Sequence, residues 1–196
     1  MALQYDSPQS GALRQGEILR DIWEHLPQYP PIESQPNQFF SVDSIHHELV
    51  VVMSPDCDLD WDFKARFPDA QSQAELRTPE RVSESPKAIP YIFLAKLYLY
   101  EGIRSRVVNS GMRERIQKNQ EERFHHFQGA LIDGSGVDRL PDLYIDFKKS
   151  LAVPTQKLYE GFSVDGVKRV ALIPAPYIHH LMHRYYGYLS RVALPE

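Results

Sequence analysis

Residues 48–54, ELVVVMS, constrain the fold of this chain more than any other stretch of its sequence. Three consecutive valines favour an extended backbone, because branching at Cβ restricts χ1, and an uninterrupted apolar run indicates a strand buried on both faces. Pro55 follows and has no N–H to donate to a neighbouring strand, so the strand is expected to end there. The chain is therefore expected to contain at least one interior strand of a sheet.

Further strands and two helices are expected around this interior strand. Residues 16–20 and 89–102 predict strands, and short strand-like runs separated by turn signals predict a meander over residues 129–173. Residues 112–127 contain no proline and are rich in Arg, Glu, Gln and Lys, which predicts a helix. Apolar residues recur at helical spacing after Pro176, which predicts a C-terminal amphipathic helix. The pattern is typical of an α+β domain built on a small antiparallel barrel or curled sheet.

The 196 residues, 42% of them hydrophobic, are enough for one sizeable core. The polar residues 1–12 predict a flexible N-terminus, so residues 13–196 are expected to form a single domain. No apolar run approaches the ~20 residues of a helical membrane span, and the start of the chain lacks a signal-peptide pattern, so a cytoplasmic protein outside the membrane is expected. Cys57, the only cysteine, excludes an internal disulfide and is expected to be a small buried residue.

Charge is distributed unevenly between the two halves of the sequence. Residues 1–102 carry 16 acidic against 8 basic residues, a net charge of −8, whereas residues 103–196 carry 10 against 14, a net charge of +4. Such asymmetry can present a basic face to an anion such as RNA. On charge alone, nucleic acid is one candidate ligand.

Four aspartates at every second position follow the interior strand: Asp56, Asp58, Asp60 and Asp62. In an extended chain all four carboxylates would share one face, where their repulsion requires a cation or an arginine. The other interpretation is a turn that begins at Pro55, with side chains bonded to local amides or solvated. An EF-hand is excluded, because its sixth and twelfth positions require Gly and Glu.

The strand followed by Asp56 and Asp58 also resembles the start of haloacid dehalogenase-type phosphatases. The resemblance implies a nucleophilic first aspartate and an acid–base second aspartate beside magnesium. It rests on these two residues only, since the Gly-Thr pair typical of that family is replaced by Leu59 and Asp60. A metal-dependent phosphoesterase is thus one alternative function.

Polar residues in the predicted helix over residues 112–127 provide a second set of candidates. Asn119, Arg123 and His126 fall on one face at helical spacing, where the helix is expected to meet the sheet and contact a carboxylate or phosphate. Arg123 is expected either to pair with Asp56 or Asp58, which the interior strand would bring beside it, or to bind an anionic ligand. His179 and His183 lie one turn apart in the last predicted helix but lack a third ligand, so no metal site is expected.

Two segments resemble the opening of the PemK/MazF-like toxins. They are LRQGEIL, residues 13–19, and ELVVVMSPDCDL, residues 48–59, which match a Gly-Asp-Ile strand connected by a loop to a valine-rich strand. The resemblance implies an SH3-like barrel, often dimeric, that cleaves single-stranded RNA or, in degenerate relatives, binds proteins. Ser54 matches the family's strand-end Ser or Thr, but no arginine occurs between Arg20 and Arg66, where the family has its catalytic arginine. A serine alone cannot stabilise the charge on a pentavalent phosphate.

The sequence therefore predicts a binding or regulatory module of PemK/MazF-like fold that acts on a protein partner or single-stranded RNA, without a cofactor or metal, in a toxin–antitoxin or defence setting. Ser54, Asn119 and Arg123 are the expected binding residues, and a homodimer is a possible assembly. The alternative is an active endoribonuclease with a relocated site. Its candidate catalytic residues are Asp56, Asp58, Arg123 and His126.

Overall fold

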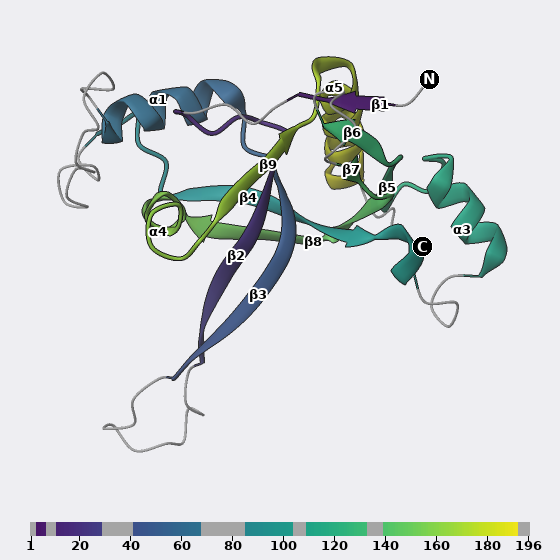
Figure 1. Cartoon of the computed structure of the whole chain (residues 1–196), viewed down its shortest axis with the longest axis horizontal. Coiled ribbons are helices and arrows are strands. Elements are labelled where there is room, and N and C mark those ends of the chain that lie inside the picture. Colours follow the sequence, from purple (N-terminus) through teal and green to yellow (C-terminus); the bar gives the residue numbers. More distant parts are fainter. Residues whose placement is uncertain are drawn as a thin grey trace.

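The computed structural model describes residues 3–6, 11–28, 41–67, 85–103, 109–132 and 139–191. A six-stranded sheet with strand order β5-β8-β4-β3-β2-β9 and a three-stranded sheet β1-β6-β7 are accompanied by helices (Figure 1). The strands are β1 (Leu3–Tyr5), β2 (Glu17–Gln28), β3 (Ser41–Val52), β4 (Tyr91–Leu99), β5 (Phe124–Phe127), β6 (Ala130–Ile132), β7 (Arg139–Leu140), β8 (Leu143–Pro154) and β9 (Lys168–Leu172). The α-helices are α1 (Asp56–Arg66), α3 (Ser110–Gln117), α4 (Thr155–Gly161) and α5 (Ala175–Leu189), and a 3₁₀ turn covers Tyr100–Gly102.

The large sheet is antiparallel throughout and is not closed into a barrel, because β5 and β9 lie at its two edges. The expected α+β class is therefore confirmed, whereas the SH3-like barrel is not. The predicted interior strand is also confirmed: Val50, Val51 and Val52 are fully buried, and β3 pairs with β2 on one side and β4 on the other. No helix in the described ranges is long and apolar enough to cross a membrane.

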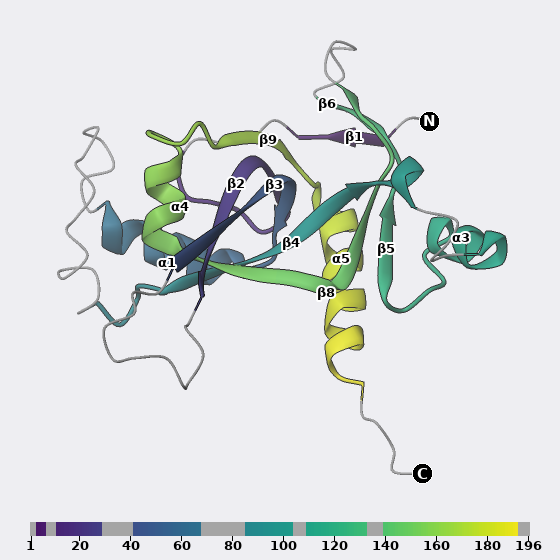
Figure 2. The same cartoon turned by 90° about the horizontal axis from the view of Figure 1, so that it is seen from below.

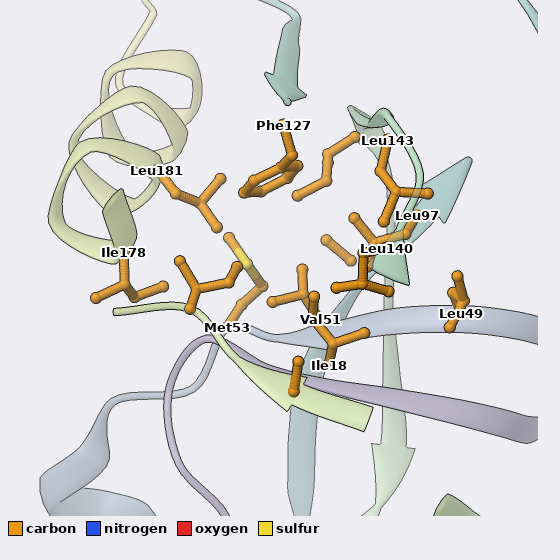
Figure 3. Close-up of a cluster of buried hydrophobic side chains, with 14 of the residues drawn as sticks. Ile18, Leu49, Val51, Met53, Leu97, Phe127, Leu140, Leu143, Ile178 and Leu181 are labelled. Atoms are coloured by element: carbon orange, nitrogen blue, oxygen red, sulfur yellow. The ribbon is translucent and has the colours of Figure 1, made fainter. Parts of the chain in front are cut away.

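Two apolar cores lie on opposite faces of β3, since alternate residues of a strand point to opposite faces. Val51 and Met53 belong to a core that α5 covers, and Figure 3 shows Ile178 and Leu181 of that helix beside Met53. Val50 and Val52 belong to a second core with residues of α1 and α4. Figures 1 and 2 place α1 and α4 toward one end of the molecule, and α3 and β5 toward the other.

The helix predicted over residues 112–127 is wrong in its second half. α3 ends at Gln117, Asn119 adopts a left-handed φ of 54°, and Phe124–Phe127 form β5 with all four residues buried. The local preference of Arg, Glu and Gln for a helix is outweighed by pairing of this aromatic segment with β8. Asn119, Arg123 and His126 therefore do not share a helix face.

Three smaller predictions also differ from the structure. Leu3–Tyr5, within the segment expected to be flexible, pairs in parallel with β6. β2 does not stop at residue 20 but continues to Gln28, although the four prolines of residues 26–37 predict a loop there. Residues 29–37 lie outside the described residues. Cys57 is exposed rather than buried, because Pro55 begins a helix and Cys57 lies on its solvent side.

Candidate functional site

The four aspartates lie on α1, so they neither form an extended ladder nor a simple turn. Asp56, in the first helical turn, accepts hydrogen bonds from Arg14 Nε at 3.1 Å, Arg14 Nη2 at 3.2 Å and the Gln15 backbone N–H at 2.7 Å. The hydrogen bond to Asp56 raises the pKa of the Arg14 guanidinium. Asp58 is half-buried in the same turn. Asp56 is thus used to attach α1 to the segment that precedes β2.

The other two aspartates pair with basic residues one turn further along α1. Lys64 Nζ lies 2.6 Å from Asp60 Oδ2 on the surface. Asp62 is fully buried and accepts from Arg66 Nε at 2.8 Å and from the Ile89 backbone N–H at 2.8 Å. Sequence reasoning missed these pairs, although the Asp-to-basic spacing of four residues was a signal for them. The aspartates are explained by structural roles.

Ser54 is similarly engaged in the fold. Its side chain is buried, and its hydroxyl accepts a hydrogen bond from the Phe93 backbone N–H at 2.9 Å. This contact continues the pairing of β3 with β4 beyond Val52. The hydroxyl of Ser54 is therefore not accessible to a ligand, which does not support its predicted binding role.

Arg123 does not meet Asp56 or Asp58, so the expected pairing is wrong. Arg123 Nε donates to Asp146 Oδ1 at 2.7 Å, and Nη2 donates to Asp146 Oδ2. This bidentate hydrogen bonding raises the pKa of Arg123. The arginine belongs to the edge of the sheet, where Phe124 of β5 pairs with Asp146 of β8. Its guanidinium is already occupied by a carboxylate.

Asn119 and His126, in contrast, are brought together. The Asn119 side-chain amide donates to the His126 carbonyl at 3.0 Å, and its oxygen accepts from the His126 backbone N–H at 2.7 Å. Arg184 of α5 donates to the carbonyl oxygens of Glu121 at 2.6 Å and Phe124 at 2.8 Å, and also to that of Asn119. The connection between α3 and β5 is thereby tied to the last helix.

This connection forms one wall of a polar pocket of about 470 Å³. The pocket lies where β5 meets the beginning of α5. Its lining residues are Gln117, Asn119, His125, His126, Phe127, Gln128, Asp142, Tyr177 and His180. Of the sequence-predicted site residues, Asn119 and His126 line it.

His125 is the most unusual residue of the pocket. It is 3% exposed, and its Nδ1 has no hydrogen-bond partner within the described part of the chain. Its ring lies 4.7 Å from that of Phe127 and 5.2 Å from that of His180, measured between centroids. Burial, followed by the nearby positive charge of Arg184, lowers the pKa of His125 to about 3. The imidazole is therefore uncharged at neutral pH.

His126 and Asp142 form a second polar contact at the same wall. His126 Nε2 lies 3.4 Å from Asp142 Oδ2, and Asp142 Oδ1 accepts a hydrogen bond from the Gly129 backbone N–H at 2.6 Å. Burial lowers the pKa of His126, and the Asp142 carboxylate partly offsets this effect. In the described ranges no group of three His, Cys, Asp or Glu residues has the geometry to hold a metal ion.

A separate surface is formed by the part of the β2–β3 hairpin that projects from the body (Figure 1). β9 pairs with β2 only over Glu17–Arg20, and β4 pairs with β3 only over Val50–Val52. We call the remainder, residues 22–28 of β2 and 41–49 of β3, the ribbon. Several large apolar side chains are exposed on it: Trp23, Leu26, Val42 and Ile45.

A groove of about 340 Å³ runs between the ribbon and α4. Its lining residues are Ile22, Trp23, His25, Val153, Pro154, Lys157, Leu158, Gly161, Asp165 and Val167. The β2 edge of the ribbon is thus bordered by a mostly apolar surface, and among the described residues no strand pairs with that edge beyond Arg20.

No family model matches the sequence, and no curated protein matches it. The resemblance to PemK/MazF-like toxins therefore stays a prediction from residues 13–19 and 48–59.

Proposed function

We propose that the chain is a binding module that holds an extended segment of a partner protein along the β2 edge of the ribbon. The observation that carries this proposal is the unpaired edge beside an apolar groove. A two-stranded ribbon is marginally stable in water, and an added strand supplies both backbone hydrogen bonds and side-chain contacts. Trp23, 45% exposed, would provide the largest contact area.

Charge favours a protein over RNA at this surface. No Lys or Arg occurs in residues 21–63, while the ribbon and its base carry Asp21, Glu24, Asp43 and Glu48. RNA binding depends on cations that neutralise phosphates; the ribbon supplies none, and Lys157, which lines the groove, is paired with Glu160. The fitting partner is a segment with apolar side chains at alternate positions and basic residues between them.

The resemblance to PemK/MazF-like toxins points in the same direction, because degenerate members of that family bind proteins. The absence of an arginine before the valine-rich strand and the engagement of Ser54 by Phe93 count against RNA cleavage at the family's usual site. A toxin–antitoxin or defence setting and an SH3-like ancestry of the sheet are part of this proposal.

The test uses the two tryptophans as a matched pair. Trp23 lies on the ribbon and Trp61 on α1, and they are 45% and 54% exposed. After affinity capture identifies a partner, Kd is measured with the purified partner for wild type, Trp23→Ser and Trp61→Ser. We expect a loss of about tenfold or more for Trp23→Ser only. Hydrogen exchange should slow at the β2 amides in the complex.

Four outcomes would overturn the proposal. One is equal affinity of the two serine variants. Another is a self-associated chain whose dimer is broken by Trp23→Ser, which would assign the edge to a second copy. The third is growth arrest on expression that Arg123→Ala or Asp58→Ala abolishes, which would favour the endoribonuclease. Magnesium-dependent phosphatase activity lost in Asp56→Ala would favour the phosphoesterase.

A further inference from the structure

The polar groups of the pocket between β5 and α5 are not all accounted for by contacts within the fold. His125 Nδ1 is buried without a hydrogen-bond partner in the described ranges, whereas His126 Nε2 has the Asp142 carboxylate 3.4 Å away. Buried polar atoms in native proteins are almost always hydrogen-bonded, so each exception calls for a missing partner. His125 Nδ1 is such an exception, and His125 lines the pocket, so the pocket is a candidate ligand site.

The charges of the pocket restrict the class of that molecule. Burial keeps His125 uncharged, so Asp142 is the only lining residue with a fixed charge. The nearby Arg184 uses both terminal nitrogens on backbone carbonyls of Asn119, Glu121 and Phe124. An anion would meet the Asp142 carboxylate, and of the Arg184 guanidinium only the buried Nε has no partner in the described ranges. An uncharged ligand fits better than a phosphate.

The Asp142 carboxylate restricts the ligand further. Its side chain is 40% exposed, Oδ1 accepts a hydrogen bond from the Gly129 backbone N–H, and Oδ2 lies 3.4 Å from His126 Nε2. A carboxylate has about four acceptor sites, which leaves room for two parallel N–H donors. A ligand with two adjacent N–H groups on one edge would satisfy it.

The remaining walls suit a flat ring. Phe127, His125, His180 and Tyr177 present aromatic rings, and Gln117 and Gln128 contribute amides. His180 and Tyr177 come from one turn of α5, and both are exposed. Aromatic side chains stack on planar heterocycles, while amides hydrogen-bond to their edges. The volume of about 470 Å³ is within the range of small-molecule sites.

We infer that this pocket binds an uncharged planar heterocycle with two adjacent N–H donors, the pattern on the Watson–Crick edge of guanine. Asp142 accepts the two N–H groups, Tyr177 and His180 stack on the ring, and His125 Nδ1 hydrogen-bonds to one of the remaining polar atoms. The site is separate from the ribbon, so it can be tested whether or not a protein partner binds there.

The experiment is a calorimetric titration of the full chain with guanosine, and with inosine, which lacks the 2-amino group. We expect saturable binding of guanosine, with Kd for inosine weaker by about tenfold or more, because one donor is lost opposite a carboxylate. Nitrogen chemical shifts of the imidazoles of His125 and His126 should move on addition of guanosine. Inorganic phosphate should not compete.

Two neighbouring histidines give a matched control. His180 lines the pocket, whereas the adjacent His179 does not, and both are exposed on α5. His180→Ala and Asp142→Asn should weaken guanosine binding by about tenfold or more, with His179→Ala unchanged. Far-ultraviolet circular dichroism shows that each variant is folded.

The inference is overturned if guanosine shows no saturable binding, if inosine binds equally well, or if phosphate displaces guanosine. It is also overturned if folded Asp142→Asn and His180→Ala bind as wild type does. None of these results depends on Trp23, so failure here is distinct from failure of the protein-binding proposal.

Discussion

The start of α1 and the pocket beside β5 are both rich in polar and charged groups, but they differ in how these groups are satisfied. On α1, Asp56, Asp60 and Asp62 each pair with a basic side chain. At the pocket, His125 retains a buried nitrogen without a partner in the described ranges, and the Asp142 carboxylate lies 3.4 Å from His126 Nε2. The density of charge in the sequence pointed to the first region, whereas incomplete hydrogen bonding points to the second. Unsatisfied polar groups are the better indicator of a binding site here.

The buried pair of Asp62 and Arg66 gives the largest expected effect. Asp62→Ala removes the partner of an arginine that is 3% exposed and leaves the Ile89 N–H without its acceptor. The free energy of unfolding should fall by about 3–5 kcal/mol. Urea denaturation measures the loss, and Asp60→Ala, on the exposed side of the same helix, should cost less than about 1 kcal/mol. Equal effects would contradict the structural role of Asp62.

His125 gives the next largest effect, and it appears only in acid. Its pKa is lowered to about 3 in the folded state, so below its ordinary value near 6.5 the unfolded chain takes up a proton that the folded chain refuses. The contribution of His125 to the free energy of unfolding is therefore fully present above about pH 6.5, and it is lost as the pH drops toward about 3. At about pH 5 the expected loss is about 2 kcal/mol.

His125→Phe should remove this dependence, because it replaces an unpartnered imidazole by an apolar ring of similar shape. Its stability at neutral pH should be equal to or above that of wild type, since an unpaired polar group is lost. Denaturant midpoints of both proteins over a pH series check the prediction. A parallel pH dependence of the two would show that His125 protonates as an exposed histidine does.

Gly129 provides a smaller effect at the same wall. A Cβ there would lie 2.9 Å from Asp142 Oδ1 and 2.9 Å from the Leu140 carbonyl oxygen, closer than contacts normally allow. Gly129→Ala should destabilise the protein by about 1–2 kcal/mol and displace Asp142. The control is Gly187→Ala in α5, where nothing lies within 4 Å and the substitution should stabilise by up to about 1 kcal/mol. Thermal unfolding distinguishes the opposite signs.

Asp56 gives the smallest expected effect. Its ion pair with Arg14 is exposed, with 47% of the Asp56 side chain accessible. Asp56→Ala should therefore cost about 1 kcal/mol or less, and the cost should shrink in high salt. Urea midpoints at low and high ionic strength check this. A loss as large as that of Asp62→Ala would contradict a solvent-screened ion pair at the start of α1.

The sequence predicted those elements whose local pattern and tertiary surroundings agree. Val50, Val51 and Val52 are apolar without interruption and are enclosed on both faces, and the spacing of Ile178, Leu181, Met182 and Tyr185 matches the buried side of α5. The second half of the predicted helix over residues 112–127 failed because β5 is stabilised by pairing with β8, about twenty residues further along the chain. Whether the sheet closes into a barrel could not be predicted from the sequence either, since closure depends on which strands lie at the edges.

The candidate site was predicted only in part, for a related reason. Asn119 and His126 were predicted as site residues on the assumption that the helix continues to residue 127, whereas α3 ends before both of them. Both nevertheless line the pocket, because they are hydrogen-bonded to each other across the turn. Asp142 and His180 were missed, since only the fold brings them to β5. The FHHF sequence of β5 was the available signal: two histidines between phenylalanines in a buried strand require polar partners from elsewhere.

The contacts of Arg184 bear on when the pocket can form during synthesis of the chain. α5 supplies Tyr177, His180 and the guanidinium that fastens the turn before β5. Since α5 is the last described element to leave the ribosome, a nascent chain that already contains β5 and β8 still lacks two of the ring walls. Capture of the heterocycle would then begin only after translation has passed this helix.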